Sequence, residues 1–254
     1  MNNDNKSNNL ENNSNTILNN KIMTSRSEPI IGVEGLENIR NSKIVIVGTG
    51  GLGSFIGLLL ARMQPKELII IDYDKVEESN LERQALYSFN DIGKNKITCA
   101  KKVLSEFCNV TAIEEKVTTK NIKDIIPIDV DLVMDCVDNT CARKAINKYC
   151  RENKINWIHA AIMQQTGILA FFNNTDESEE NTTGCFECYN QNKQGQKGSE
   201  TGVLNSSVAT ISSMSANIAI NFLATGEYPK DLIRINLKDF SVMKLKYKKC
   251  FFCR

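Results

Sequence analysis

The chain has 254 residues, of which 41% are hydrophobic, and its 31 basic and 30 acidic side chains leave a net charge of +1. This length can bury one large or two small cores, and so balanced a charge excludes an electrostatic surface for nucleic acid or anionic lipid. His159 is the only histidine, which excludes sites that need two, such as histidine-rich zinc sites and the two-histidine metalloprotease helix.

The nine cysteines favour a reducing compartment. We expect a cytoplasmic protein, because no basic start followed by an apolar stretch indicates a signal peptide. Its thiols are then expected to serve metal or redox chemistry rather than a disulfide framework. No membrane span is expected from the apolar runs.

The first 23 residues are rich in asparagine and carry no periodic apolar face. Such a segment cannot bury enough surface to offset the entropy lost on ordering, so residues 1–23 are predicted to be a disordered tail. Codon bias in an AT-rich genome would also explain the asparagine excess. Residues 173–183 form a second polar segment, which is predicted to be a flexible loop.

Beyond the tail, β-branched apolar runs alternate with segments of helical periodicity. Strands are predicted at residues 43–47, 67–72, 110–117, 131–134, 155–159 and 166–172, and helices at residues 52–63, 97–107, 139–152 and 205–224. Gly226 is placed as the C-cap of the last helix, and residues 232–237 and 241–247 alternate like an antiparallel hairpin. The pattern predicts an α/β fold with a Rossmann-like, doubly wound, mostly parallel sheet, extended by antiparallel C-terminal strands.

A glycine-rich turn follows the first predicted strand. Residues 48–53 (GTGGLG) lie between a buried strand and a helix, where a nucleotide fingerprint belongs. The glycines allow close backbone approach, and the helix start offers unpaired N–H groups to phosphate. Asp72, at the end of the next strand, is where a ribose-binding carboxylate belongs. The sequence predicts a nucleotide site, with glycines that serve only helix–sheet packing as the alternative.

Charged residues further along bear on which nucleotide binds. Arg83 and Lys96 would supply fixed positive charge for a polyphosphate, and Asp138, at the end of a predicted strand, could hold Mg²⁺. A nicotinamide-dependent oxidoreductase would use the same glycine turn but leaves these charges unexplained. Taken singly, each charge fits a solvated surface residue, and only their order along the chain indicates a shared site.

In that order, the segments SNLERQ (79–84), GKNK (93–96) and DCVDN (135–139) resemble the ThiF/MoeB/HesA family of adenylating enzymes, relatives of the ubiquitin-activating enzymes. The resemblance runs from about Ile31 to Cys253 and includes GVEG (32–35), which is similar to the family's helix ahead of the glycine turn. It implies a single adenylation domain at residues 24–254. Within it, the nucleotide-binding half would span about 42–160 and the zinc- and partner-binding part about 161–254.

The resemblance also implies roles for individual residues. The ATP-binding residues would be Gly48, Gly50, Gly51, Gly53, Asp72, Asp74, Asn80, Arg83, Gln84, Lys96, Asp138 and Asn139. Asp138, Arg83 and Lys96 would be catalytic, with Asp138 organising Mg²⁺ and the reacting α-phosphate. Such chemistry needs positioned phosphates and neutralised charge rather than a general base, so a single histidine is no obstacle.

Two departures from the family's pattern concern a partner arginine and a nucleophile. The family often extends an arginine into the partner subunit's nucleotide site. Arg26 is the only candidate here and is slightly out of register, so a solvated arginine is an equal alternative. The family resemblance implies a homodimer, and so would an Arg26 that extends into the partner subunit's nucleotide site. Many relatives carry a nucleophilic cysteine in the loop after the first CxxC pair, whereas residues 190–203 contain none. We therefore expect no covalent transfer through this loop.

Two CxxC pairs supply four soft thiolates, which is the set that closes a tetrahedral zinc site: Cys185, Cys188, Cys250 and Cys253. Their long separation is unusual for a zinc ribbon, but the family commonly carries both pairs; separate redox features are the alternative. The remaining cysteines are predicted to be buried small hydrophobes: Cys99, Cys108, Cys136, Cys141 and Cys150. His159 is predicted to be a hydrogen-bonded histidine of the core or of a strand end, with a position facing the nucleotide crevice as the alternative.

The sequence therefore predicts an adenylyltransferase that uses ATP and Mg²⁺ and carries structural Zn²⁺. The expected substrate is the C-terminal glycine of a small ubiquitin-like sulfur carrier of the ThiS or MoaD kind, which ends in Gly-Gly. A small-molecule or peptide carboxylate is the alternative substrate. An NAD(P)-dependent oxidoreductase and a relative that only binds a partner are alternatives from other classes, and neither nucleic acid nor a membrane is expected as a partner.

Overall fold

The structure is a computed structural model that describes residues 23–175, 183–190, 202–246 and 250. Several sequence expectations lie outside these residues in whole or in part. They are the asparagine-rich tail, the polar segment at 173–183, the loop at 190–203, the end of the predicted hairpin at Tyr247, and Cys253.

The described strands form one eight-stranded sheet in the order β3-β2-β1-β4-β5-β6-β7-β8. The parallel part consists of β3 (Val110–Glu114), β2 (Glu67–Asp72), β1 (Lys43–Val47), β4 (Leu132–Asp135) and β5 (Trp157–Met163). Antiparallel pairing continues it through β6 (Thr166–Phe172), β7 (Leu232–Asn236) and β8 (Ser241–Leu245). The chain order reverses between β1 and β4, where a doubly wound sheet opens a crevice beyond its carboxyl ends.

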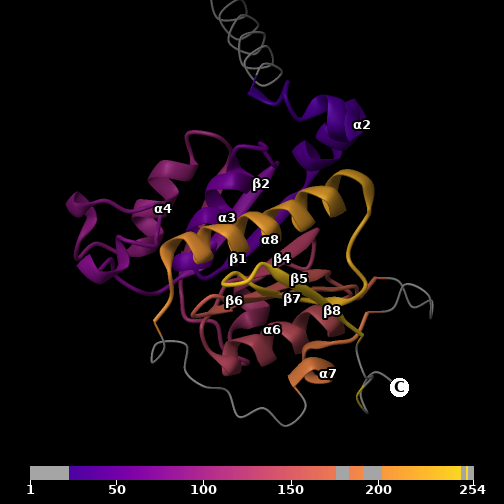
Figure 1. Ribbon diagram of the computed structural model, residues 1–254. Helices are drawn as coiled ribbons and strands as arrows, with labels where there is room; N and C mark the ends of the chain where they lie inside the picture. The colour runs from indigo at the N-terminus through magenta and orange to yellow at the C-terminus, as the bar shows by residue number, and fades with distance from the viewer. Residues whose placement is uncertain (1–22, 176–182, 191–201, 247–249, 251–254) are drawn as a thin grey trace, which may run out of the picture.

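Helices cover both faces of the sheet (Figure 1). One face carries α3 (Gly51–Ala61), α4 (Lys96–Leu104) and α8 (Asn205–Thr225), which share a core with Ile44 and Ile46. The other carries α5 (Ile122–Ile125), α6 (Thr140–Glu152) and α7 (Phe186–Asn190), which share a core with Val45 and Val47. Because β1 is covered on both sides, its sequence is a continuous apolar run rather than an alternating one.

The predicted fold class is confirmed, with differences at the ends of some elements. β5 extends to Met163 instead of ending at His159, because it pairs with β6 along its whole length as a hairpin. Gln164, in the connection, has a positive φ of 55°. β3 ends at Glu114 instead of residue 117, where the chain leaves the sheet. The short helices η1 (Glu78–Asn80) and η2 (Phe89–Asp91), together with α5 and α7, were not predicted.

Two long helices pack against each other beside the sheet (Figure 1). α2 (Glu28–Asn41) contains the predicted GVEG segment but is kinked at Gly32, whose φ is 74°. α8 is long and apolar enough, by length and composition alone, to cross a membrane, contrary to the expectation that no segment qualifies. It packs on α2, α3, β5 and β6, and a buried core helix passes the same test, so its length is weak evidence of a span. Gly226 caps it with a φ of 76°, as predicted.

Candidate nucleotide-binding site

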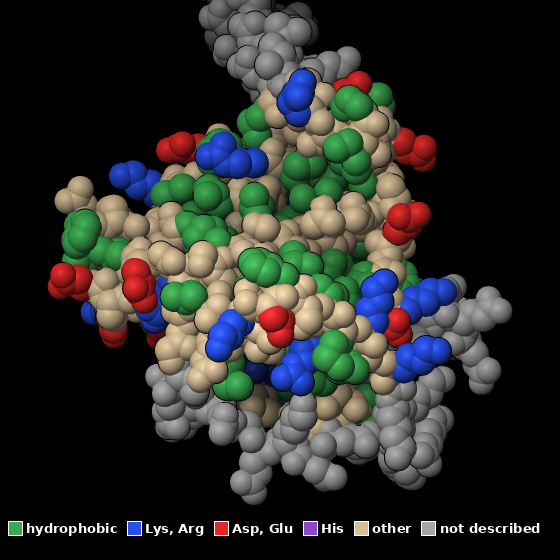
Figure 2. Space-filling view, viewed as in Figure 1, with side chains coloured by type: hydrophobic (Ala, Val, Ile, Leu, Met, Phe, Trp, Pro, Cys, Tyr) green, Lys and Arg blue, Asp and Glu red, His purple; other side chains and the backbone are tan. Residues whose placement is uncertain are grey.

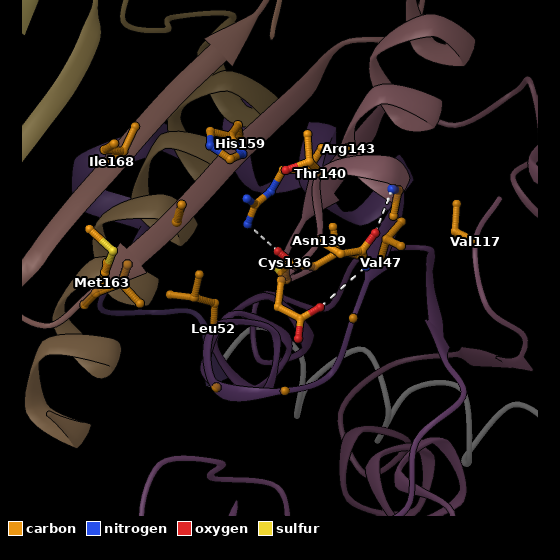
Figure 3. Close-up of a pocket in the computed structure, with 18 of the residues that line it drawn as sticks. Val47, Leu52, Val117, Cys136, Asn139, Thr140, Arg143, His159, Met163 and Ile168 are labelled. Atoms are coloured by element: carbon orange, nitrogen blue, oxygen red, sulfur yellow. Dashed lines mark hydrogen bonds between the residues drawn. The ribbon is translucent and has the colours of Figure 1, made fainter. Parts of the chain in front are cut away.

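A cavity of about 730 Å³ opens at the carboxyl ends of β1, β2 and β4. Figure 3 shows it running from Val117 at one end to Met163 and Ile168 at the other, with Leu52 and Asn139 between them. Its wall includes most of the residues that the family resemblance implies: Gly48, Gly50, Gly51, Asp72, Asp74, Arg83, Gln84, Lys96, Asp138 and Asn139. Gly53 and Asn80 are not part of this wall.

The glycine turn joins β1 directly to α3. Gly48 has a φ of 91°, a left-handed conformation that favours glycine. α3 begins at Gly51 without a side-chain cap, so its first turn brings unpaired N–H groups to the cavity wall. Gly53 has a different role, because a Cβ there would lie 1.9 Å from the carbonyl oxygen of Gly48. Its lack of a side chain lets α3 pack against the turn.

Asp72 ends β2 and is only 7% exposed. Its Oδ2 accepts hydrogen bonds from the backbone N and the Oγ1 of Thr49, at 2.6 and 2.9 Å, and its Oδ1 accepts one from the backbone N of Asp74 at 2.9 Å. Tyr87, whose pKa is raised by burial, donates its hydroxyl to the Thr49 carbonyl at 2.9 Å. Asp72 therefore holds the glycine turn against β2 as well as lining the cavity.

Two cations and a buried amide belong to the same wall. Lys96, at the start of α4, is 6% exposed, and its Nζ lies 3.2 Å from Asp74 Oδ2. Arg83 donates to the Ser79 carbonyl at 2.7 Å. Gln84 is buried, and its Oε1 has no hydrogen-bond partner in the described part of the chain. An unmade hydrogen bond on a buried amide costs free energy, which a ligand at this wall would offset.

Asn80 supports the site from outside the cavity. It ends η1, and its Oδ1 accepts a hydrogen bond from the backbone N of Glu77 at 3.2 Å. This capping bond shapes the turn that leads to Arg83 and Gln84. The asparagine in SNLERQ thus has a local structural role. The motif alone does not show whether an asparagine at this position shapes the turn or contacts a ligand.

Asp138 is exposed in the turn between β4 and α6. Asn139 follows it, and its Oδ1 caps α6 by accepting from the backbone N of Ala142 at 2.9 Å, while its Nδ2 lies 3.5 Å from Asp138 Oδ1 (Figure 3). An accessible carboxylate beside a helix N-terminus suits a hard cation such as Mg²⁺ that also contacts phosphate.

A buried polar network joins β4, β5 and α6 next to this turn. Asp135 Oδ2 lies 2.7 Å from His159 Nδ1 and 3.4 Å from Arg143 Nε, and Arg143 also donates to the carbonyl of Val137. Burial lowers the pKa of His159, against the opposing effect of Asp135. His159 is hydrogen-bonded at a strand, as predicted, and it also lines the cavity, as the alternative had it. Asp135 and Arg143 were missed, because nothing local separates them from surface charges.

The thiolates come together beyond the sheet. The Sγ atoms of Cys185, Cys188 and Cys250 all lie within 4.8 Å of one another, with Cys185 at 3.8 Å from Cys188 and 3.7 Å from Cys250. The edge of a zinc–thiolate tetrahedron is about 3.8 Å for a Zn–S bond of about 2.3 Å. The backbone N of Cys250 also donates to Cys188 Sγ at 3.2 Å. Their spacing therefore fits zinc ligands; Cys253 lies outside the described residues.

The other cysteines match their prediction only in part. Cys99 and Cys150 are buried, Cys108 and Cys136 are half-buried, and Cys141 is exposed. The prediction was wrong for Cys141 because α6 is amphipathic and residue 141 falls on its solvent face with residues 144, 148 and 151. Cys136 lines the cavity.

The strand order, the glycine turn at the β1/β4 switch point and the acidic end of β2 together define a nucleotide-binding α/β domain of the Rossmann type. The model of the ThiF family matches residues 24–251, and the chain belongs to this family, which confirms the resemblance seen in the sequence.

Curated relatives carry adenylyltransferase and activating-enzyme names. The chain is 40% identical over 149 residues to a probable molybdopterin-synthase adenylyltransferase of Porphyra purpurea, covering 57% of this chain and 38% of that protein. It is 33% identical over 174 residues to ubiquitin-like modifier-activating enzyme 5 of Aedes aegypti, covering 61% and 42%. It is 29% identical over 210 residues to the sulfur carrier protein ThiS adenylyltransferase of Escherichia coli (strain K12), covering 81% of each. The chain thus spans about two fifths of the first two relatives.

Solved structures share the fold. Escherichia coli MccB superposes with a TM-score of 0.80 at 22% identity, covering 91% of this chain and 72% of MccB. The structure of the same protein with ATP gives a TM-score of 0.75 at 22% identity, covering 87% and 68%. At this identity the likeness establishes the architecture and nothing finer.

Gly53→Ala tests the packing of the glycine turn. Its Cβ would lie 1.9 Å from a backbone oxygen that no side-chain rotation can move, so we expect the free energy of unfolding to fall by about 1–3 kcal/mol. Gly202→Ala is the control, because a Cβ there has no neighbour within 4 Å in the described part of the chain. Urea unfolding compares both variants with wild type, and equal stability of all three would contradict the packing role.

Proposed function

We propose that this protein is an adenylyltransferase that uses ATP to activate a carboxylate, giving an acyl adenylate and pyrophosphate. The observation that carries the proposal is the grouping of Arg83, Lys96 and Asp138 on one cavity wall with the first turn of α3. Fixed cations, helix N–H groups and an accessible carboxylate are what a polyphosphate with Mg²⁺ requires. The names of the relatives support the same chemistry.

In the proposed binding mode, the glycine turn receives the phosphates, and Arg83, Gln84 and Lys96 hold them. Asp72 would bind the ribose through Oδ1. Its Oδ2 already accepts two hydrogen bonds from Thr49, whereas Oδ1 accepts one and keeps a lone pair for a hydroxyl. Asp74 would orient Lys96, since the two side chains are paired.

In the proposed reaction, a carboxylate oxygen of the substrate attacks the α-phosphorus. The bond from that phosphorus to the bridging oxygen breaks, and pyrophosphate leaves with the electron pair. The carboxylate is already ionised near neutral pH, so no side chain has to remove a proton. Arg83 and Lys96 would stabilise the charge that gathers on the leaving group. Mg²⁺ held by Asp138 would supply further neutralisation of the phosphates.

We propose the C-terminal glycine of a ubiquitin-like sulfur carrier as the carboxylate. The E. coli relative named for the sulfur carrier ThiS, aligned over 81% of both chains, supports this substrate. The end of the cavity at Met163, Ile168 and Leu245 offers apolar side chains and would take the extended tail of a carrier. A peptide or small-molecule carboxylate is the alternative, favoured by the shared fold of MccB, which has been solved with MccA. An NAD(P)-dependent oxidoreductase would leave Asp138 and the Lys96–Asp74 pair without a role.

The product would pass to a separate sulfur donor or acceptor, because residues 190–203 contain no cysteine. A serine hydroxyl in that loop would be a poor replacement, since its pKa is far above that of a thiol.

We also propose a homodimer. On α2, Ile30 is 84% exposed and Val33 61%, and Figure 2 shows hydrophobic side chains gathered over α2 and α8. A second subunit would cover such a surface. Arg26 lies just ahead of α2, is exposed and is not part of this chain's cavity wall, so it would be free to reach the nucleotide site of the other subunit.

A structural Zn²⁺ is the third part of the proposal, with Cys185, Cys188, Cys250 and Cys253 as ligands. The 3.7 and 3.8 Å spacings between Sγ atoms support it. The ion would tie the start of α7 to the chain that follows β8, two segments that come from distant parts of the sequence.

Exchange of labelled pyrophosphate into ATP tests the proposed activity. We expect exchange that requires Mg²⁺ and a carrier ending in Gly-Gly, and we expect Asp138→Ala to lower its rate by about 100-fold, because charge stabilisation at the phosphates is lost. Asp124→Ala is the matched control, since it removes an exposed carboxylate on α5 outside the cavity wall.

If the wild-type protein shows no pyrophosphate exchange with carriers, peptides or small carboxylates, the proposed function is wrong. If exchange persists in Asp138→Ala, adenylation stands and only the Mg²⁺ ligand is misplaced.

Zinc content and chelation test the thiolate site. We expect the purified protein to contain zinc and a strong chelator to lower its Tm, because the ion would join two segments that are far apart in the sequence. Cys188→Ser should lose the metal, whereas Cys141→Ser, at an exposed cysteine outside the cluster, should keep it. A metal-free wild type with an unchanged Tm would argue against the zinc site.

A further inference from the structure

The network around Asp135 uses every oxygen of a fully buried carboxylate. Oδ1 accepts a hydrogen bond from the backbone N of Val137 at 3.1 Å, and Oδ2 is shared by His159 Nδ1 at 2.7 Å and Arg143 Nε at 3.4 Å. Its side chain has no solvent exposure. A buried carboxylate is costly unless it is paired and hydrogen-bonded, so its position is determined by these three partners.

The same contacts determine the path of the chain toward Asp138. The peptide groups of Val137 are held on both sides: its N–H donates to Asp135, and its carbonyl accepts from Arg143 Nη2. The backbone N of Cys136 also donates to the Val47 carbonyl at 2.9 Å. Figure 3 shows Arg143 reaching from α6 toward this turn, with His159 beside it. Asp138 is the next residue, so the direction of its carboxylate follows from the position of Val137.

His159 is held rigidly where it meets Asp135. Its ring packs edge-on against Phe186, with centroids 5.4 Å apart, and against Trp157 at 6.4 Å. The side chain is 1% exposed, and burial lowers its pKa, which favours the neutral ring. Since the partner of Nδ1 is a carboxylate oxygen, Nδ1 is the nitrogen that carries the proton.

We propose that His159 is a positioning residue for the adenylation step, acting through Asp135 on the turn that carries Asp138. By donating Nδ1–H, the ring fixes the carboxylate that in turn fixes Val137. The inference rests on the proposed function, because the direction of Asp138 matters where a polyphosphate and Mg²⁺ bind. Without this donor, Oδ2 is left to Arg143, which is drawn away from the Val137 carbonyl, and the turn loses one of its two anchors.

Two substitutions separate positioning from packing. In His159→Asn, the amide Nδ2–H lies close to the place of Nδ1–H and still donates to Asp135, whereas His159→Leu keeps an apolar side chain and removes the donor. We expect His159→Leu to lower the maximal exchange rate by about 100-fold, the effect of a misplacement of about 1 Å. The KM for ATP should stay unchanged, and His159→Asn should restore most of the rate. Equal rates in the two folded variants would overturn the proposal.

The single histidine allows a second test that needs no carboxylate substrate. In wild-type protein labelled with ¹⁵N-histidine and purified without a histidine tag, NMR should show a neutral ring protonated on Nδ1, with that proton shifted strongly downfield. Asp135→Asn should remove the downfield shift. Addition of ATP with magnesium chloride should move the ring signals in wild type and leave them unmoved in Asp138→Ala.

The two tests fail in different ways. A His159 ring protonated on Nε2, or ring signals that do not shift when ATP and Mg²⁺ are added, overturns the positioning role even if the protein catalyses pyrophosphate exchange. A ring protonated on Nδ1 that responds to ATP and Mg²⁺, in a protein that activates no carboxylate, supports the link from His159 to Asp138 and contradicts the proposed function alone.

Discussion

Two buried carboxylates at the ends of parallel strands shape the cavity. Asp72 ends β2 and Asp135 ends β4, and β1 lies between these strands in the sheet. Each uses Oδ1 to accept the backbone N–H two residues on, that of Asp74 at 2.9 Å and that of Val137 at 3.1 Å. This bond bends the chain where the strand ends, so that Asp74 on one side and Asp138 on the other join the cavity wall. The chemistry of the wall depends on this pair of turns.

The partners of the two carboxylates differ, and so does the charge around them. Thr49 donates twice to Asp72 through neutral groups, which leaves the end of β2 acidic, and Lys96 is placed beside it through Asp74. Asp135 is instead paired with the guanidinium of Arg143 and with the imidazole of His159. Asp72 lines the cavity, where a ligand can reach it, whereas Asp135 has no solvent exposure, is not part of the cavity wall and acts as an anchor.

The fold could be predicted because its signals are local. KIVIV and ELIIID are continuous apolar runs of the kind that parallel strands need when helices cover both faces. The glycine turn is recognisable from its glycines, which lie between a strand and a helix. The His159–Asp135 pair could not be predicted, since it exists only through the pairing of β4 with β5, which sets residue 135 opposite residue 159. The exposure of Cys141 depends on how α6 is rotated about its axis, and a lone cysteine carries no signal of that rotation.

Phe186 connects the thiolate cluster to the nucleotide site. It lies between Cys185 and Cys188, its ring packs on His159, and its backbone N donates to Asn147 Oδ1 of α6 at 3.0 Å. α6 begins at Thr140, two residues after Asp138, and it packs against α7. A bound ion that fixed α7 at its cysteine end would also limit the movement of the His159 ring, which is hydrogen-bonded to Asp135. None of the three described cysteines is part of the cavity wall, but Phe186 is, so the cluster can influence the position of Asp135 through the packing of Phe186 on His159.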